Sequence, residues 1–241
     1  MPGKVEAGLP SGIATNQSGK MRGKFITFEG GEGSGKSTQV AGLAMRLQKL
    51  GISVKVSREP GGSAGAEAIR HVLLSGAAKP LGPHAEAILF AAARADHLRE
   101  TIRPALERGQ WVISDRFADS TRVYQGVLGN VEAQVIGRLE KLVVGEQMPD
   151  LTIILDLDPT IGLARVTKRR GNAPVDRFEA EEFDFHKKLR EAYLDLAARE
   201  PDRVAVVDAR GDATAVASGV WAIVKDRLDP TWRPKRIRDA S

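Results

Sequence analysis

Apolar residues along this chain gather in short, nearly continuous runs. Such runs are typical of strands that are buried on both faces in a parallel sheet, whereas half-exposed strands alternate apolar and polar positions. Four of the five runs have this uninterrupted character. We therefore predict five strands, at Lys24–Glu29, Ile52–Ser57, Trp111–Asp115, Leu151–Asp156 and Arg203–Asp208.

Between these runs, apolar residues recur every three or four positions, which predicts amphipathic helices. Gly51 follows the first helical pattern as a natural C-terminal cap. Pro104 is expected to kink the third pattern, or to start a new helix that ends near Gly109. Asp158 and Pro159 form an N-cap and first-turn proline for the fifth. The expected helices are Lys36–Leu50, Ala64–Leu74, His84–Arg103, Val131–Val144, Pro159–Arg170, Glu181–Arg199 and Ala213–Leu228.

Strands and helices alternate along the chain, which predicts an α/β fold with a parallel sheet covered by helices on both faces. Residues 1–22 are rich in Gly, Ser and polar residues without periodicity, so we expect a disordered tail there. Residues 229–241 are expected to form a loose C-terminal tail. One domain is then expected over residues 23–228.

Composition narrows the class of protein. Of 241 residues, 42% are apolar and 28% charged, which is typical of a soluble globular chain, and no apolar run reaches membrane-spanning length. The absence of cysteine excludes disulfides, thiolate metal sites and cysteine nucleophiles, and it fits a cytoplasmic location. The net charge of +5 is compatible with a surface that faces phosphate. With no dedicated nucleic-acid motif, we expect neither nucleic acid nor a membrane as partner.

The strongest motif is the segment Gly30–Ser37, which reads G-G-E-G-S-G-K-S and fits the phosphate-binding pattern G-x-x-x-x-G-K-[ST]. A predicted strand precedes it and a predicted helix follows, as this loop requires. Its glycines let the backbone wrap around an anion with the N–H groups pointing inward. Lys36 can reach the outer phosphates, and the Ser37 hydroxyl can bind Mg²⁺.

Four of the five predicted strands end in an acid, and ligands of such folds bind at the carboxyl ends of the strands. Asp115 is followed directly by Arg116, so the carboxylate could hold Mg²⁺ through water while the guanidinium binds a phosphate. Asp156 and Asp208 end their strands in the same way, and such an Asp is often only the cap of the next helix. The pattern therefore favours Asp115 only slightly.

Two pairs of residues are spaced to share a helix face. Phe90 and Arg94 could stack on a base and bind its edge, although a core Phe beside a surface Arg is the commoner arrangement. Thr121 and Gln125 could read a nucleoside, or could equally be a cap and a solvated face.

A basic segment spans about residues 165–180, where Arg and Lys residues flank a Gly-Asn-Ala-Pro loop. A solvated cationic loop is the simpler interpretation. We favour a phosphate lid because the first phosphate loop carries no arginine of its own, and arginines that close on a transferring phosphoryl group stabilise its charge.

Taken in order, five segments resemble the bacterial thymidylate kinase family from about residue 24 to 225. The phosphate loop resembles E-G-x-x-G-x-G-K-[ST]-T, and Arg58–Ser63 resembles R-E-P-G-G-T. Leu89–His97 resembles L-F-A-A-D-R-x-x-H, and Asp115–Gly126 resembles D-R-[YF]-x-x-S-x-x-A-Y-Q-G. Asp158–Arg165 and Asp176–Glu179 resemble the family's strand-to-lid segment.

The resemblance implies a P-loop NTPase fold with a five-stranded parallel sheet and a short lid, and phosphoryl transfer from ATP to dTMP with Mg²⁺. It implies ATP binding by Gly30, Gly31, Glu32, Gly33, Ser34, Gly35, Lys36, Ser37, Thr38 and Arg165, and Mg²⁺ binding by Ser37 and Asp115. It implies dTMP binding by Glu29, Arg58, Phe90, Arg94, Arg116, Thr121, Tyr124 and Gln125. Catalytic roles fall on Lys36, Glu29, Arg169, Arg170 and Arg116, with Arg177 also in the lid. A homodimer is implied as well.

The chain departs from the family pattern at Ala93, where Asp is usual, and this affects the expected contacts of the acceptor. The bond between Glu59 and Pro60 could be cis or trans. Two other functions stay open: a kinase for another pyrimidine monophosphate, and a nucleotide-dependent switch ATPase.

Overall fold

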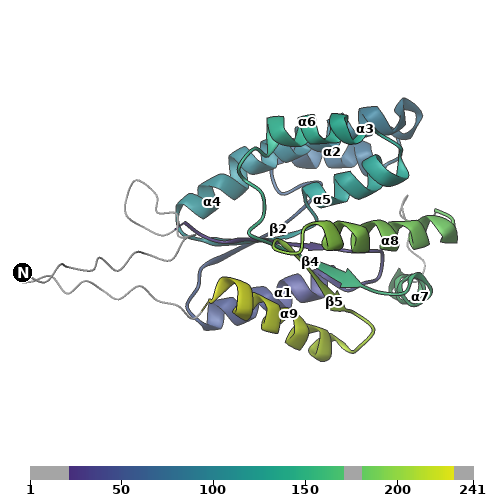
Figure 1. Cartoon of the computed structure of the whole chain (residues 1–241). Coiled ribbons are helices and arrows are strands. Elements are labelled where there is room, and N and C mark those ends of the chain that lie inside the picture. The colour runs from purple at the N-terminus through teal and green to yellow at the C-terminus, as the bar shows by residue number, and fades with distance from the viewer. Residues whose placement is uncertain (1–21, 171–180, 231–241) are drawn as a thin grey trace, which may run out of the picture.

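The computed structural model describes residues 22–170 and 181–230, so most of both predicted tails and residues 171–180 of the predicted lid lie outside the described residues. The described chain forms one sheet of parallel strands in the order β2-β3-β1-β4-β5 (Figure 1). The strands are β1 (Phe25–Glu29), β2 (Val54–Arg58), β3 (Trp111–Asp115), β4 (Leu151–Asp156) and β5 (Val204–Asp208). All five predicted strands are confirmed, although β2 begins two residues later than expected.

The seven predicted helices are also present. The described helices are α1 (Lys36–Lys49), α2 (Ala64–Leu74), α3 (Gly82–His97), α4 (Arg103–Glu107), α5 (Ala118–Thr121), α6 (Ala133–Val143), α7 (Pro159–Arg170), α8 (Phe183–Arg199) and α9 (Ala213–Leu228). A short 3₁₀ segment, η1 (Lys79–Leu81), and two π-helical segments, η2 (Leu98–Ile102) and η3 (Arg122–Leu128), complete the set.

Pro104 starts a new helix, which was one of the two expected outcomes: it lies in the first turn of α4, where its missing N–H is not needed. Two helical details differ from expectation. The predicted helix over His84–Arg103 passes into the π-helical segment η2 before α4 begins. The helical stretch of α5 and η3 was not predicted as an element, although the spacing of Thr121 and Gln125 assumed it. The predicted cap at Asp158 is confirmed, since its carboxylate accepts the Thr160 N–H at 2.8 Å.

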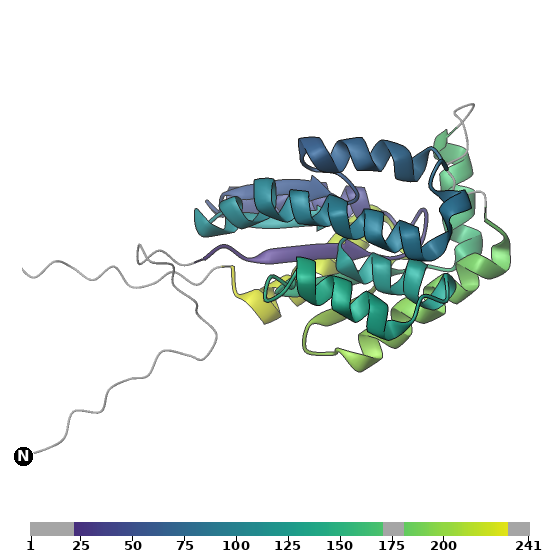
Figure 2. The same ribbon diagram turned by 90° about the horizontal axis from the view of Figure 1, so that it is seen from above.

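Both faces of the sheet are covered, which explains the continuous apolar runs (Figures 1 and 2). Ile26 and Phe28 of β1 pack toward α1 and α9, whereas Phe25, which precedes them, packs with η2 and α4 on the other face. On that second face α8 and η3 pack against β4 and β5. The edge strand β2 instead exposes Lys55 and Val56.

The winding of the sheet decides where a ligand can bind. From the central strand β1 the chain crosses to one edge for β2 and β3, and to the other side for β4 and β5. This reversal opens a crevice at the carboxyl end of β1, which leads into the phosphate loop. Phe28 of β1 pairs with Asp115 of β3, so the ends of these two strands lie side by side.

A buried ionic cluster fixes the segment that follows β3. Asp119 of α5 is fully buried and receives a two-pronged contact from Arg203, at 2.7 and 2.8 Å. Thr152 of β4 also donates to Asp119, at 3.0 Å, and its hydroxyl lies 2.8 Å from that of Thr27. These contacts tie α5 to β1, β4 and the start of β5, and so fix the neighbouring Ser120 and Thr121.

Candidate active site

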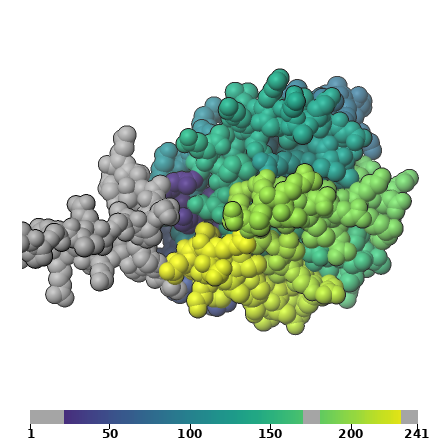
Figure 3. All heavy atoms as spheres, viewed as in Figure 1, coloured from purple at the N-terminus to yellow at the C-terminus, as the bar shows by residue number. Residues whose placement is uncertain are grey.

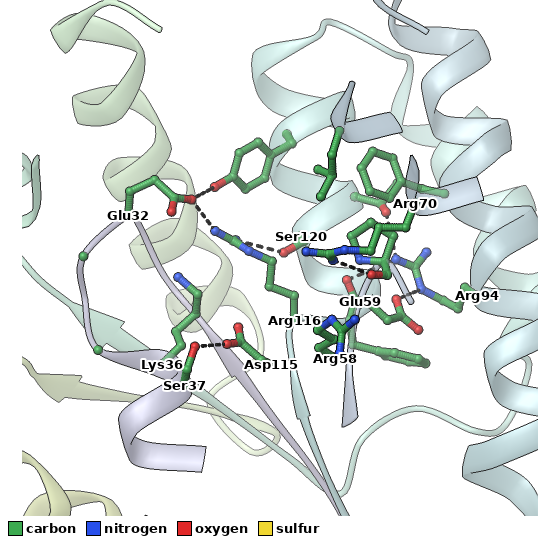
Figure 4. A pocket seen from close by; sticks show the side chains of 18 of the residues that line it. Glu32, Lys36, Ser37, Arg58, Glu59, Arg70, Arg94, Asp115, Arg116 and Ser120 are labelled. Carbon is green, nitrogen blue, oxygen red and sulfur yellow. Dashed lines mark hydrogen bonds and ion pairs between the residues drawn. The ribbon is translucent and has the colours of Figure 1, made fainter. Parts of the chain in front are cut away.

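A cavity of about 310 Å³ opens at the carboxyl ends of β1, β2 and β3 (Figure 4). Of the residues predicted for the site, it is lined by Glu32, Gly33, Gly35, Lys36, Ser37, Thr38, Arg58, Phe90, Arg94, Asp115, Arg116, Thr121, Tyr124, Gln125 and Arg169. Five arginines and Lys36 line it against three carboxylates, counting Arg70 and Glu59, which were not predicted. Cations therefore outnumber anions, which suits an anionic ligand.

The phosphate loop forms one end of the cavity. The Lys36 ammonium folds back on the loop and donates to the carbonyls of Gly30 and Gly31, at 3.0 and 2.9 Å. Burial, and then the charge of Arg116, lower the pKa of Lys36. Gly33 has a φ of 72°, and a Cβ there would meet the carbonyl oxygen of Gly162 in α7. Glycine thus lets the loop and the helix before the predicted lid touch through their backbones.

Ser37 and Asp115 meet beside this loop. The Ser37 hydroxyl donates to the Asp115 carboxylate at 2.7 Å, and both face the cavity (Figure 4). A hydroxyl and a carboxylate are hard oxygen ligands, and Mg²⁺ in nucleotide sites uses one or two protein oxygens together with phosphates and water. The described residues contain no group of three or more His, Cys, Asp or Glu side chains placed to hold a metal. The pair fits Mg²⁺ better than a metal held by protein ligands alone.

Arg116 projects into the middle of the cavity from a strained backbone. Its φ of 71° lies in the left-handed region, which a residue with a side chain seldom adopts. Its guanidinium contacts Glu32 at 2.6 Å, the Ser120 hydroxyl at 3.3 Å and Tyr193 at 3.2 Å. Burial raises the pKa of Glu32, but the charges of Arg116 and Lys36 outweigh it, so that pKa lies below its ordinary value. Arg116 therefore stands between the phosphate loop and the rest of the cavity.

Glu29 lies beneath the cavity rather than in its wall. This carboxylate is fully buried and accepts the Phe117 N–H at 2.8 Å, the Ser120 hydroxyl at 2.6 Å and the Tyr193 hydroxyl at 2.8 Å. Burial raises the pKa of Glu29 from its ordinary value of 4.5 to about 7, although the Arg116 charge opposes this. Glu29 can therefore act on a ligand through Ser120, whose hydroxyl it holds and which does line the cavity.

The end of the cavity remote from the phosphate loop is built from α3, α5 and η3. Phe90 and Arg94 of α3 both line it, as their spacing predicted. Arg94 is buried and donates to the Thr121 hydroxyl at 3.0 Å and to the Phe117 carbonyl at 3.2 Å. Gln125 donates to Glu86 at 3.5 Å. An aromatic ring, a guanidinium, a hydroxyl and an amide thus surround one volume, a suitable set for a base.

Several predicted residues lie elsewhere. Gly30 and Gly31 line a much smaller cavity behind the loop, and Ser34 is buried. The Arg165 guanidinium donates to the carbonyls of Ala209, Arg210 and Gly211 in the loop after β5. The side chain of Arg170 and the whole of Arg177 lie outside the described residues. The bond between Glu59 and Pro60 is cis.

Sequence reasoning missed four residues that build the site. Glu59 and Arg70 line the cavity, Tyr193 supports Glu29 and Arg116, and His97 contacts Glu59. Glu59 stood in a quoted motif, and so did His97, but neither received a role. Tyr193 lies 164 positions from its partner Glu29, so no local pattern marks it.

The phosphate loop forms one end of this cavity, and the other end, here called the chamber of Phe90 and Arg94, is lined by further arginines. This arrangement defines a P-loop phosphotransferase, because such a cavity has room for a donor phosphate and an acceptor. Comparison with known proteins agrees with this class. The model of the thymidylate kinase family matches residues 28–219. The chain belongs to the thymidylate kinase family and is thereby an enzyme of the nucleoside monophosphate kinase class.

Individual relatives support the assignment along nearly the whole chain. The thymidylate kinase of Nitrobacter hamburgensis is 56% identical over 215 residues, which is 89% of this chain and 94% of the relative. That of Bradyrhizobium diazoefficiens is 56% identical over 87% of this chain and 92% of its own. The crystal structure of thymidylate kinase from Ehrlichia chaffeensis superposes with a TM-score of 0.69 at 31% identity, covering 84% of this chain and 99% of that one.

Within residues 22–170 and 181–230, no helix combines the length and the apolar character needed to cross a membrane.

The buried Glu29 predicts a pH-dependent stability. Its folded-state pKa of about 7 lies above the unfolded value, so the folded protein retains a proton that the unfolded chain loses between about pH 4.5 and 7. Stability from this group therefore falls as the pH rises through that range. We expect Glu29→Gln, which does not ionise, to gain up to about 3 kcal/mol relative to the native chain between pH 5 and pH 8 in urea unfolding.

Glu67→Gln serves as the control for that measurement. The Gly62 N–H lowers the pKa of the half-buried Glu67 carboxylate, so its variant should show no gain with rising pH. A Glu29→Gln difference that stays constant from pH 5 to pH 8 would contradict the assignment.

Proposed function

We propose that this chain transfers the γ-phosphoryl group of ATP to dTMP, giving dTDP and ADP. The observation that carries the proposal is the position of Arg116, between the phosphate loop and the chamber of Phe90 and Arg94. A cation there can neutralise an acceptor phosphate that lies next to the donor's terminal phosphate. Family membership supports both the reaction and the donor.

The donor end is assigned to the phosphate loop. Lys36 now donates to two loop carbonyls, and the same ammonium can turn to the β- and γ-phosphates. Ser37 and Asp115 would hold Mg²⁺, which when bound supplies positive charge to the phosphate oxygens. Arg165 already fixes the loop after β5, where we place the adenine of ATP.

The acceptor end is assigned to the arginine-lined chamber. Arg116 and Arg58 would hold the acceptor phosphate, with Phe90 stacked on thymine and Arg94, Thr121 and Gln125 on its edge. Tyr124, whose hydroxyl lies 3.4 Å from Glu32, would contact the sugar and crowd its 2′ position. Glu29 would act from beneath, by setting Ser120 and Arg116.

In the reaction, an oxygen of the acceptor phosphate forms a bond to the γ-phosphorus while the bond to the bridging β–γ oxygen breaks. No covalent enzyme species is needed, so the protein positions the groups and neutralises charge. Arg169 reaches the cavity from the end of α7, which supports a role for it on the transferring group.

A homodimer and a cytoplasmic location complete the proposal. The helices α2, α3 and α6 lie together as one layer (Figure 1). This layer exposes apolar side chains, among them Ile88 at 56% and Leu142 at 82%. In α6 only Ile136 is buried although apolar residues recur along the helix. A second copy of this chain covering that layer would bury them.

The first experiment measures ADP release with ATP and Mg²⁺ in the presence of dTMP, dUMP, dCMP, dGMP or no acceptor. We expect strong turnover with dTMP and weaker turnover with dUMP. Equal turnover without any acceptor would instead indicate a switch ATPase. A preference for another monophosphate would keep the mechanism but exclude dTMP as the substrate.

Arg169→Ala tests the role of the lid. Removing a cation that acts only on the transferring group should lower kcat by about 10³-fold or more while the Kd for ATP changes little. The matched control is Lys168→Ala, which removes the neighbouring exposed cation that does not line the cavity. Equal losses in ATP binding and turnover would contradict the assignment of Arg169.

Leu142→Asp tests the dimer. A carboxylate buried in an apolar contact should shift the chain toward monomer in sedimentation equilibrium. Met45→Asp is the control, because Met45 is 58% exposed on α1, on the opposite face of the sheet (Figure 1). If both variants have the same mass as the native chain, the α6 layer is not the interface.

A further inference from the structure

A chain of buried hydrogen bonds leads from the edge strand β2 to Arg94. The Ser57 hydroxyl lies 2.6 Å from Nε2 of His97, and Nδ1 of His97 lies 2.9 Å from Oε1 of Glu59. The other carboxylate oxygen of Glu59 accepts from Nε of Arg94 at 2.8 Å. His97 is fully buried, and only 7% of Glu59 is exposed.

The partners fix the direction of each bond. The Glu59 carboxylate is an acceptor for Arg94, so Nδ1 of His97 must donate to its other oxygen. Nε2 of a neutral His97 then accepts the Ser57 hydroxyl proton. Ser, His and Glu also form this order in hydrolases. Here, however, Arg94 already neutralises the carboxylate, and His97 neither reaches solvent nor lines the cavity, so the arrangement positions side chains.

Each carboxylate oxygen of Glu59 accepts one hydrogen bond in this series, and both donors, Arg94 and His97, belong to α3. His97 holds Oε1, and the carboxylate is thereby turned so that Oε2 faces Arg94. The guanidinium can then direct Nη2 at Thr121, across the cavity from α3. Without His97, Oε1 would be a buried acceptor with an empty partner position, and the carboxylate would rotate to satisfy it.

The loop after β2 is shaped to admit His97. Gly62 has a φ of 87°, and a Cβ at this position would collide with both Nε2 of His97 and the Ser57 hydroxyl. The Thr101 hydroxyl donates to the Gly62 carbonyl at 2.7 Å, and Asp96 accepts the Ser63 hydroxyl at 2.7 Å. The loop that follows Arg58 and carries Glu59 is therefore held against α3 and η2 around His97.

We propose that His97 is a positioning residue for the acceptor nucleobase: through Nδ1 it sets Glu59, and Glu59 aims Arg94 at the base. The inference rests on the proposed function, in which Arg94 binds the base edge. His97 then affects binding of the acceptor, and leaves the donor phosphates and the transfer step unchanged.

Two substitutions test the roles of the two ring nitrogens of His97 one at a time. In His97→Asn the amide nitrogen lies near the position of Nδ1 and can still donate to Glu59, whereas in His97→Gln the amide lies near Nε2 and can satisfy only Ser57. Loss of a hydrogen bond to a charged partner corresponds to about a tenfold change in binding. We expect His97→Gln to raise KM for dTMP about tenfold, with kcat and KM for ATP within about twofold.

The His97→Asn variant, which keeps a donor to Glu59, should have a KM for dTMP within about threefold of the native value. Ser57→Ala is the matched control, since it removes the hydrogen bond on the far side of the same ring, and its KM should change less than twofold. A His97→Gln enzyme with native KM for dTMP would overturn the proposal, as would equal increases in KM for all three variants. Thermal unfolding of each variant records its stability alongside.

If His97→Gln does not fold, Glu59→Gln replaces it, because the amide keeps a single acceptor oxygen and can accept from only one of His97 and Arg94. An unchanged KM for dTMP in that variant would also overturn the proposal. The native enzyme, run in the same assay, tests the function separately. If it turned over another monophosphate but not dTMP, the proposed function would fail, while the pattern of KM for that acceptor would still test His97.

Discussion

The buried carboxylate of Glu29 is the interaction on which the site depends. It terminates the central strand and accepts hydrogen bonds from Phe117, Ser120 and Tyr193, and so joins β1 to α5 and α8. Burying a carboxyl group this completely favours its neutral form, which is why its pKa rises to about 7 despite three donors. The free-energy cost of burying this carboxyl group arises where the phosphate loop, Arg116 and Ser120 must be held in fixed positions relative to one another.

Two buried ion pairs also fix the walls of the site. Asp119 and Arg203 hold α5 against β4 and β5, while Glu59 holds Arg94 from the opposite wall. Each pair has hydrogen-bond partners beyond the Coulombic contact, as a buried pair needs if it is to define a geometry. Thr121 lies between them, next to Asp119 in sequence and bonded to Arg94 in space. The Phe90–Arg94 end of the cavity is thus fixed from two sides, by the Asp119–Arg203 pair, which does not line the cavity, and by Glu59, which does.

Local sequence patterns predicted most of the fold and the phosphate-loop end of the cavity. The continuous apolar runs predicted the five strands because β1, β3 and β4 are buried on both faces, and the phosphate loop needs only neighbouring residues to take its shape. The stretch of α5 and η3 escaped prediction because it is short: α5 has four residues and the π-helical η3 has seven, too few for a helical period to stand out. Roles for Glu59 and His97 depend on partners 35 and 38 positions away, respectively, and no spacing rule within one element reaches so far.

Charge balance in the cavity follows from the same geometry. Lys36 and Arg116 are close enough that each disfavours the other's charge, which contributes to the lowered pKa of Lys36. Glu32 offsets part of this repulsion through its 2.6 Å contact with Arg116.

Two bound phosphates would supply the remaining negative charge, one at each cation. Their arrival would strengthen the ammonium form of Lys36 and free Glu32 from its present partner. The backbone carbonyl of Glu32 also lies against Gly162 of α7, the helix that carries Arg169. The position of Arg169 therefore depends on how α7 packs against the phosphate loop.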